Sequence, residues 1–166
     1  MGAGLANFFR YNLWANQVLL DTCEPLTDTQ LDASAAGVYG SVRAILMHLF
    51  SSEESYVGRV GGQAPGSRLI ESDIFPGFDE LRRRAEQSGQ ALITFAEAAT
   101  EADLTRILHL DSGTYDAPVY IVLIQAINHA IDHRSQIATV LSQQGIALPD
   151  LAGWGYNDAV VTPDQN

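Results

Sequence analysis

Apolar residues recur every three or four positions in four long stretches of the chain, which is the spacing of one face of an α-helix. The first stretch covers about residues 5–23 and is interrupted by Pro25. The second follows Ser41, a favourable N-cap residue, and should stop near the glycines at 58, 61 and 62. The third covers about residues 78–98, with charged residues on its opposite side. We therefore expect three amphipathic helices before the end of the chain.

The fourth stretch is apolar on several sides and predicts the longest helix. We expect Asp116 to be its N-cap and Pro118 to lie in its first turn. The helix should run to Gln144, because Gly145 follows as a C-terminal stop. These four helices favour an all-α four-helix bundle with an irregular C-terminal tail from about residue 146.

Shorter elements are predicted between the helices. Thr27 to Gln30 has the pattern of a capping box and predicts one short helical turn. Residues 33–40 are small and form a connector, and residues 63–77 form a long crossover loop. Leu104 to Leu110 partly alternates in polarity and precedes the turn-forming residues 111–113. A small β-hairpin before the last long helix is therefore expected.

The composition narrows the class of protein. A chain of 166 residues that is 46% hydrophobic suits a single domain over residues 1–166. Twenty acidic residues against nine basic ones, all arginine, give a net charge of −11, which disfavours nucleic acid as a partner. Cys23 is the only cysteine, so no disulfide within the chain can form. No positively charged leader and no apolar run of about 20 residues is present, so we expect a cytoplasmic protein without membrane association.

Three histidines are the main candidates for chemistry. His129 and His133 are four residues apart, which stacks both imidazoles on one side of the last helix. His48 lies on the face of the second helix that should turn inward. The alternative is that each histidine is an ordinary core or rim residue. The pattern favours a three-histidine metal centre with open coordination positions, because structural zinc sites usually have four protein ligands.

Other polar residues near these histidines are weaker candidates. Glu53 lies about 140° around the helix from His48, so it is badly aimed for the same metal and would contact a neighbouring helix or act from the pocket edge. Asp132 is a second candidate for a general base. Tyr56 is better aligned with His48, where its hydroxyl would hydrogen-bond a metal-bound ligand. A tyrosine in such a position is more often a packed aromatic. Arg134 would attract an anionic substrate or a carboxylate of a partner subunit, or form a surface salt bridge, which we favour.

The chain resembles the DinB/YfiT-like family of metalloenzymes in three stretches. These are Tyr11-Asn-Leu-Trp-Ala-Asn16, the pair His48 and Glu53, and His129-Ala-Ile-Asp-His133-Arg-Ser-Gln136. The resemblance implies an up-down-down-up four-helix bundle and a homodimer. It also implies a divalent metal, commonly nickel or zinc, held by His48, His129 and His133.

The resemblance leaves the reaction open. Thiol-dependent relatives imply a metal-dependent S-transferase that joins a low-molecular-weight thiol to a small electrophile, since a metal lowers the pKa of a thiol. One alternative is a metal-dependent hydrolase with Glu53 or Asp132 as general base. The other is a non-catalytic, stress-related metal-binding dimer.

Overall fold

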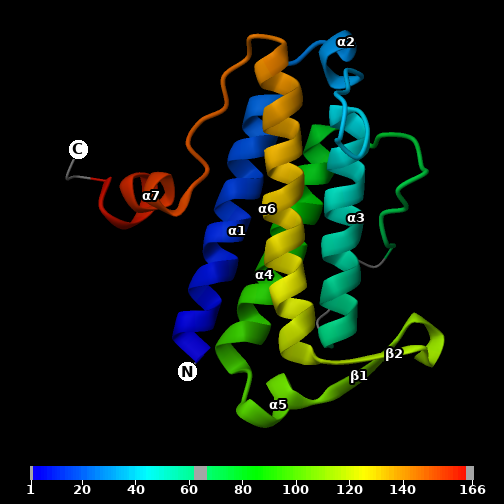
Figure 1. Ribbon diagram of the computed structural model, residues 1–166. Coiled ribbons are helices and arrows are strands. Elements are labelled where there is room, and N and C mark those ends of the chain that lie inside the picture. The colour runs from blue at the N-terminus through cyan, green and yellow to red at the C-terminus, as the bar shows by residue number, and fades with distance from the viewer. Residues whose placement is uncertain (1, 62–66, 164–166) are drawn as a thin grey trace.

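Four long helices lie side by side in the computed structural model, which describes residues 2–61 and 67–163 (Figure 1). They are α1 (Gly2–Cys23), α3 (Val42–Val60), α4 (Phe78–Ala98) and α6 (Val119–Gln143). Helices α1 and α6 run in one direction, and α3 and α4 run in the other (Figure 1). The predicted all-α, up-down-down-up bundle is therefore confirmed.

Side-chain caps and one glycine set the ends of the second long helix. Thr27 and Gln30 form the expected capping box at the start of the short helix α2 (Asp28–Leu31). The Ser41 hydroxyl accepts a hydrogen bond from the backbone N–H of the third residue after it and so caps α3. Of the expected stops, Gly58 lies inside α3, whereas Gly61 ends it in the left-handed conformation, with φ of 94°. A side chain at Gly61 would be strained there.

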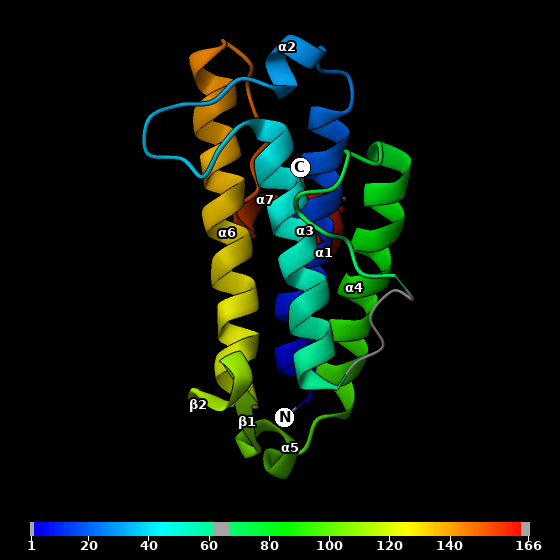
Figure 2. The same cartoon turned by 90° about the vertical axis from the view of Figure 1, so that its right-hand side faces the viewer.

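Because α3 and α4 run in the same direction, the chain must cross the length of the bundle between them. Residues 67–77 belong to this crossover and lie along the outside of α3 and α4 (Figure 2). Residues 63–66 of the expected loop, and the expected stop at residue 62, lie outside the described residues. The backbone N–H of Leu69 donates to Glu54 Oε2 at 2.7 Å, and Arg84 Nη1 pairs with Glu54 Oε1 at 2.8 Å. This buried ion pair holds the crossover loop against the bundle.

The predicted hairpin is present at the lower end of the bundle (Figure 1). The short elements there are α5 (Glu101–Thr105), β1 (Ile107–Leu110) and β2 (Tyr115–Pro118). The strands pair antiparallel with His109 opposite Asp116, whose Oδ1 lies 2.7 Å from His109 Nδ1. The prediction that Asp116 caps the last helix is wrong, because its carboxylate is engaged in the hairpin and Pro118 occupies the N-cap position.

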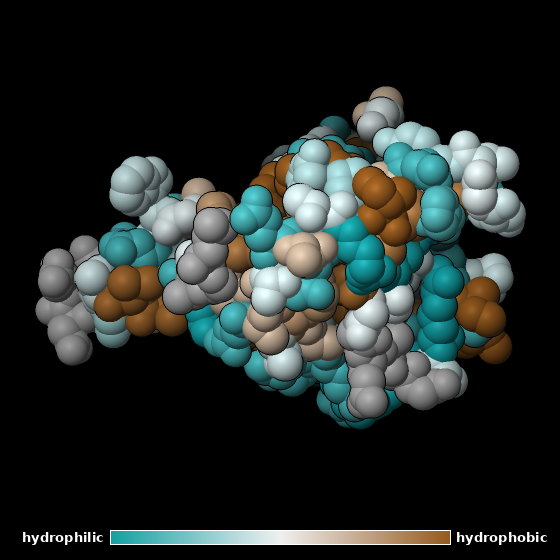
Figure 3. Space-filling model, turned by 90° about the horizontal axis from the view of Figure 1, so that it is seen from below, coloured by the Kyte–Doolittle hydropathy of each residue, from teal (hydrophilic) through white to brown (hydrophobic). Residues whose placement is uncertain are grey.

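The chain after α6 is more ordered than expected. It forms α7 (Gly153–Tyr156) and a π-helical segment, Asn157–Val161, which project to one side of the bundle seen from below (Figure 3). The Tyr11 hydroxyl donates to the Leu151 carbonyl at 2.9 Å, which ties this segment to α1. The prediction of an irregular tail from about residue 146 holds up to Gly153 and is wrong for these two helical segments.

Apolar side chains fill the space between the four long helices. An upper group surrounds Phe50 and Ile137, and a lower group surrounds Phe9 and Leu92. Within the described ranges, no helix is both long and apolar enough to cross a membrane.

Candidate metal centre

The three predicted histidines meet in the structure. His48 comes from α3, and His129 and His133 come from α6, one helical turn apart. His129 Nε2 lies 3.0 Å from His48 Nε2 and 3.1 Å from His133 Nε2. The candidate ligand atoms of all three rings lie within 4.8 Å of one another. The centre is partly covered, with His133 only 5% exposed.

The donor set fits a divalent cation. Two nitrogen atoms 3.0 or 3.1 Å apart can each lie about 2.0–2.1 Å from a shared ion, and the third ligand atom lies within 4.8 Å of the other two. Burial, together with the nearby His133 and His48, lowers the pKa of His129 to about 4. Burial is also the main cause that lowers the pKa of His133. Both rings are therefore neutral at pH 7, and neutral imidazole is the form that binds a metal. The three Nε2 atoms face one another, so either a proton shared between neighbouring rings or a cation must lie between them.

Two loop residues orient the His48 ring. Glu71 Oε2 lies 2.9 Å from His48 Nδ1, so a proton on Nδ1 is donated to the carboxylate and the Nε2 lone pair faces the other histidines. The Tyr39 hydroxyl donates to the same carboxylate, and its ring stacks on His48 with centroids 4.1 Å apart. Hydrogen bonds from His48 and Tyr39 lower the pKa of Glu71. The sequence analysis missed both residues, because they lie in loops without a periodic signal.

Further contacts cover the centre on the α6 side. The backbone N–H of Tyr39 donates to Gln136 Oε1 at 2.8 Å, and Gln136 Nε2 donates to Asp132 Oδ2 at 3.0 Å. Asp132 itself is exposed. The Tyr56 ring meets His129 edge-on, with centroids 5.7 Å apart. Tyr56 is thus a packed aromatic at the rim of the centre, which is the more common role of a tyrosine in such a position.

Glu53 lies in a buried polar network instead of among the histidines. Its Oε2 accepts hydrogen bonds from Asn12 Nδ2 at 2.9 Å and Asn16 Nδ2 at 3.0 Å. Its Oε1 accepts one from the Ser88 hydroxyl. Burial raises the pKa of Glu53, although these hydrogen bonds and the positive charge of Arg134 oppose the rise. Contact with neighbouring helices, one of the two outcomes considered for Glu53, is what the structure shows.

Arg134 completes this network. Its Nη1 donates to Asn12 Oδ1 at 2.8 Å and to Asn16 Oδ1 at 2.7 Å, and the residue is 3% exposed. The prediction of a surface salt bridge at Arg134 is wrong, because the side chain points into the bundle. The network joins α1, α3, α4 and α6, so it includes both helices that carry the histidines.

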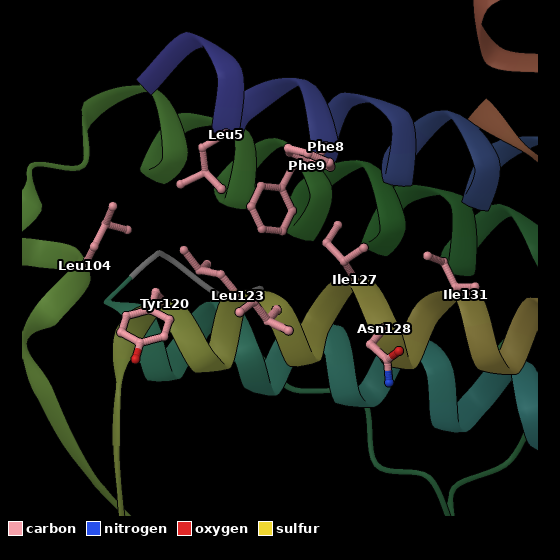
Figure 4. A pocket seen from close by; sticks show the side chains of 10 residues that line it. Leu5, Phe8, Phe9, Leu104, Tyr120, Leu123, Ile127, Asn128 and Ile131 are labelled. Carbon is pink, nitrogen blue, oxygen red and sulfur yellow. The ribbon is translucent and has the colours of Figure 1, made fainter. Parts of the chain in front are cut away.

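An apolar pocket lies between α1 and α6, away from the histidines (Figure 4). Its volume is about 470 Å³, and Phe8 and Ile127 are among its lining residues. Ile127 is two residues from His129, which places it about 160° around the helix from the histidine face. Among its ten lining residues, only Tyr120 and Asn128 have polar side-chain atoms. The histidine centre is therefore the better candidate for chemistry.

Known proteins resemble this chain in sequence and in fold. It is 23% identical to the protein DinB of Bacillus subtilis over 146 residues, which cover 84% of this chain and 85% of that protein. A crystal structure of a DinB-like protein from Bacillus cereus matches with a TM-score of 0.71 at 22% identity, over 89% of this chain and 95% of the other. The DinB-like protein YjoA of Bacillus subtilis matches with a TM-score of 0.56 at 15% identity, over 84% and 92%. The model of the DinB family matches residues 1–164, and the chain therefore belongs to the DinB family.

Proposed function

We propose that this protein is a metal-dependent S-transferase that joins a low-molecular-weight thiol to a small electrophile. His48, His129 and His133 are the proposed ligands of a divalent metal, nickel or zinc, both of which imidazole binds well. The observation that carries the proposal is that the Nε2 atoms of three histidines converge, and that no fourth ligand joins this cluster among the residues that the structure describes. The proposal includes a homodimer in a reducing cytoplasm, where such thiols are available.

The chain itself cannot supply the sulfur nucleophile. Cys23 is fully buried, and burial raises the pKa of its thiol to about 12, so the thiolate is absent at neutral pH. The thiol must then be a cosubstrate. A bound divalent cation would supply a Lewis acid that lowers the pKa of that thiol. In the transfer, the thiol gives its proton to solvent water, sulfur forms a bond to a carbon of the electrophile, and the bond from that carbon to the leaving group breaks as the leaving group departs with its electron pair.

The residues around the centre hold the ligands in place. Glu71 fixes the tautomer of His48 by accepting from Nδ1, and Tyr39 limits rotation of the ring by stacking on it. The alternative of hydrolysis needs a general base near the metal. Both oxygens of Glu53 already accept hydrogen bonds in the buried network, and Asp132 is exposed and paired with Gln136. Without a free base, a thiol is the better nucleophile for the centre, because it is more acidic than water and would lose its proton to solvent more readily.

Elemental analysis of tag-free protein tests the ligand set. We expect the wild-type protein to hold about one metal ion per chain and His48→Ala, His129→Ala and His133→Ala to lose it. His109→Ala is the matched control, because that ring lies in the hairpin against Asp116 and should leave the metal content unchanged. Stoichiometric metal in all three site variants would contradict the proposed ligands.

The reaction is tested with the metal-loaded wild-type protein. A panel of thiols with electrophiles is run beside a panel of esters and amides. Thiol consumption supports the transferase, whereas ester or amide cleavage without thiol consumption supports the hydrolase. If neither panel turns over and removal of the metal lowers the melting temperature strongly, the metal is structural and the proposal is wrong.

A further inference from the structure

A second cavity lies where α3, α6 and the hairpin meet. Its volume is about 360 Å³. Tyr56 and Gln125 line it on the helices, Tyr115 lines it on the hairpin, and Arg59 and Asp111 bring two opposite charges. The hairpin passes below the ends of α3 and α6 that form this cavity (Figure 1). The cavity therefore has polar groups, unlike the apolar pocket between α1 and α6.

The cavity lies next to the histidine centre. Gln125 is one helical turn before His129 on α6, so both residues lie on the same side of that helix. Tyr56 lines the cavity and also packs edge-on against the His129 ring. On α3, Arg59 is eleven residues after His48, which brings it back to within about 20° of the same direction. A molecule in this cavity would thus lie beside the histidine centre and along both helices that build it.

Arg59 is the single cation among the lining residues. Its ion pair with Asp111 is long, at 3.9 Å, and both side chains are exposed, 38% and 66%. Such a pair is weak, so an incoming anion can compete for the guanidinium. Arg59 lies about 16 Å from His48 along α3, and its guanidinium lies 3.9 Å from Asp111 at the hairpin end of the cavity. An anionic group held by this guanidinium would therefore lie more than about 10 Å from the histidine centre, which requires an elongated ligand.

We propose that this cavity binds the substrate, and that Arg59 recognises a carboxylate carried by an elongated small molecule whose reacting atom lies at the histidine centre. The inference rests on the proposed function for what happens at the reacting end. The carboxylate can belong to either the thiol or the electrophile, because Arg59 would recognise it in the same way in both. The net charge of −11 repels acidic ligands from most of the surface. Arg59 is the local positive charge that favours an acidic ligand at this cavity.

Two matched pairs of ligands test the proposal with the nickel- or zinc-loaded protein. One pair is glutathione and its diethyl ester, each with the neutral electrophile 1-chloro-2,4-dinitrobenzene. The other is 6-(4-chloro-3-nitrobenzamido)hexanoic acid and its methyl ester, each with the neutral thiol 2-mercaptoethanol. The KM of each is measured by turnover, and the affinity of all four ligands is measured by calorimetry. A preference for the acid in only one pair identifies which substrate carries the carboxylate.

We expect Arg59→Gln to raise the KM for the acid about tenfold, because the hydrogen bond from a charged group is lost. The kcat for the acid and the KM for the ester should stay unchanged. Arg59→Lys should retain part of the preference. Asp111→Asn should lower the KM for the acid, since it frees Arg59, and asparagine tolerates the positive φ of 49° at this position. Arg10→Gln is the control, because Arg10 pairs with Glu97 on another face.

Failure of the two proposals can be told apart. Absence of turnover with every thiol and electrophile contradicts the proposed transferase activity. Calorimetry with the same ligands then shows whether the cavity binds a carboxylate through Arg59. Binding of an acid in preference to its ester, lost in Arg59→Gln and kept in Arg10→Gln, supports the cavity in either case. Equal affinity of the wild-type protein for acid and ester, or an equal preference in the Arg59→Gln variant, overturns it.

Discussion

The buried network around Glu53 should make Arg134 one of the most sensitive positions for stability. Arg134→Met keeps much of the apolar stem and removes the guanidinium. Two hydrogen bonds to Asn12 and Asn16 are lost, and the carboxylate of Glu53 stays buried without its positive neighbour. Hydrogen bonds to a charged group contribute about 1.5–3 kcal/mol each, and breaking a buried charge pair costs about 3–5 kcal/mol. We expect a loss of about 3–5 kcal/mol in the free energy of unfolding.

Urea denaturation followed by circular dichroism measures this loss. The paired variant Glu53→Gln/Arg134→Met separates the buried charge from lost packing. If the uncompensated carboxylate causes the loss, the double variant should be about 1–2 kcal/mol more stable than Arg134→Met alone. Arg10→Met is the surface control, because its ion pair is exposed and should contribute less than about 1 kcal/mol. A loss below about 1 kcal/mol for Arg134→Met would refute the reasoning.

Three further predictions concern groups elsewhere in the chain. Glu71→Ala should weaken metal binding about 10–100-fold in calorimetry, because His48 loses the acceptor that orients it, whereas Glu86→Ala should not. Hydrogen bonds from Arg83, then from Arg84, lower the pKa of Glu80 from 4.5 to about 2, so its stabilising effect is complete above about pH 4.5 and is lost as the pH falls toward 2. The stability difference between wild type and Glu80→Gln in urea should therefore be constant from about pH 5 to 8 and shrink below that range. Because burial raises the pKa of Cys23 to about 12, iodoacetamide at pH 8 should label it, by mass spectrometry, only in denaturant.

Each of these predictions has a plain counter-result. Unchanged metal affinity in Glu71→Ala would mean that the loop does not orient His48. A stability difference for Glu80→Gln that persists unchanged at pH 2 would contradict the lowered pKa. Equal labelling of Cys23 in native and denatured protein would show that the thiol is accessible, which would also weaken the argument for an external thiol.

The long helices and their caps could be predicted because their signals are local. Apolar spacing, the Ser41 cap and the capping box at Thr27 each involve residues within a few positions of one another. The same kind of signal was present at Thr100 and Asp103, which form a capping box at the start of α5, and it was overlooked. The assignment of Asp116 failed because pairing with His109 across the hairpin competed with its capping tendency.

The candidate site was predicted only in part, because only some of its residues have local signals in the sequence. A spacing of four residues places His129 and His133 on one side of any helix, and an apolar face directs His48 inward. The sequence by itself therefore determined the helical bundle and its three candidate ligands. Glu71 and Tyr39 reach His48 from loops, and no periodicity indicates where a loop residue will lie.

Tertiary structure alone decided which polar groups became buried partners. Arg134 has no acidic partner on its own helix in the structure, and its hydrogen bonds come from α1. Glu53 likewise depends on donors from α1 and α4. Such partners are fixed when the helices pack, since a buried charge is stable only where other elements supply its hydrogen bonds.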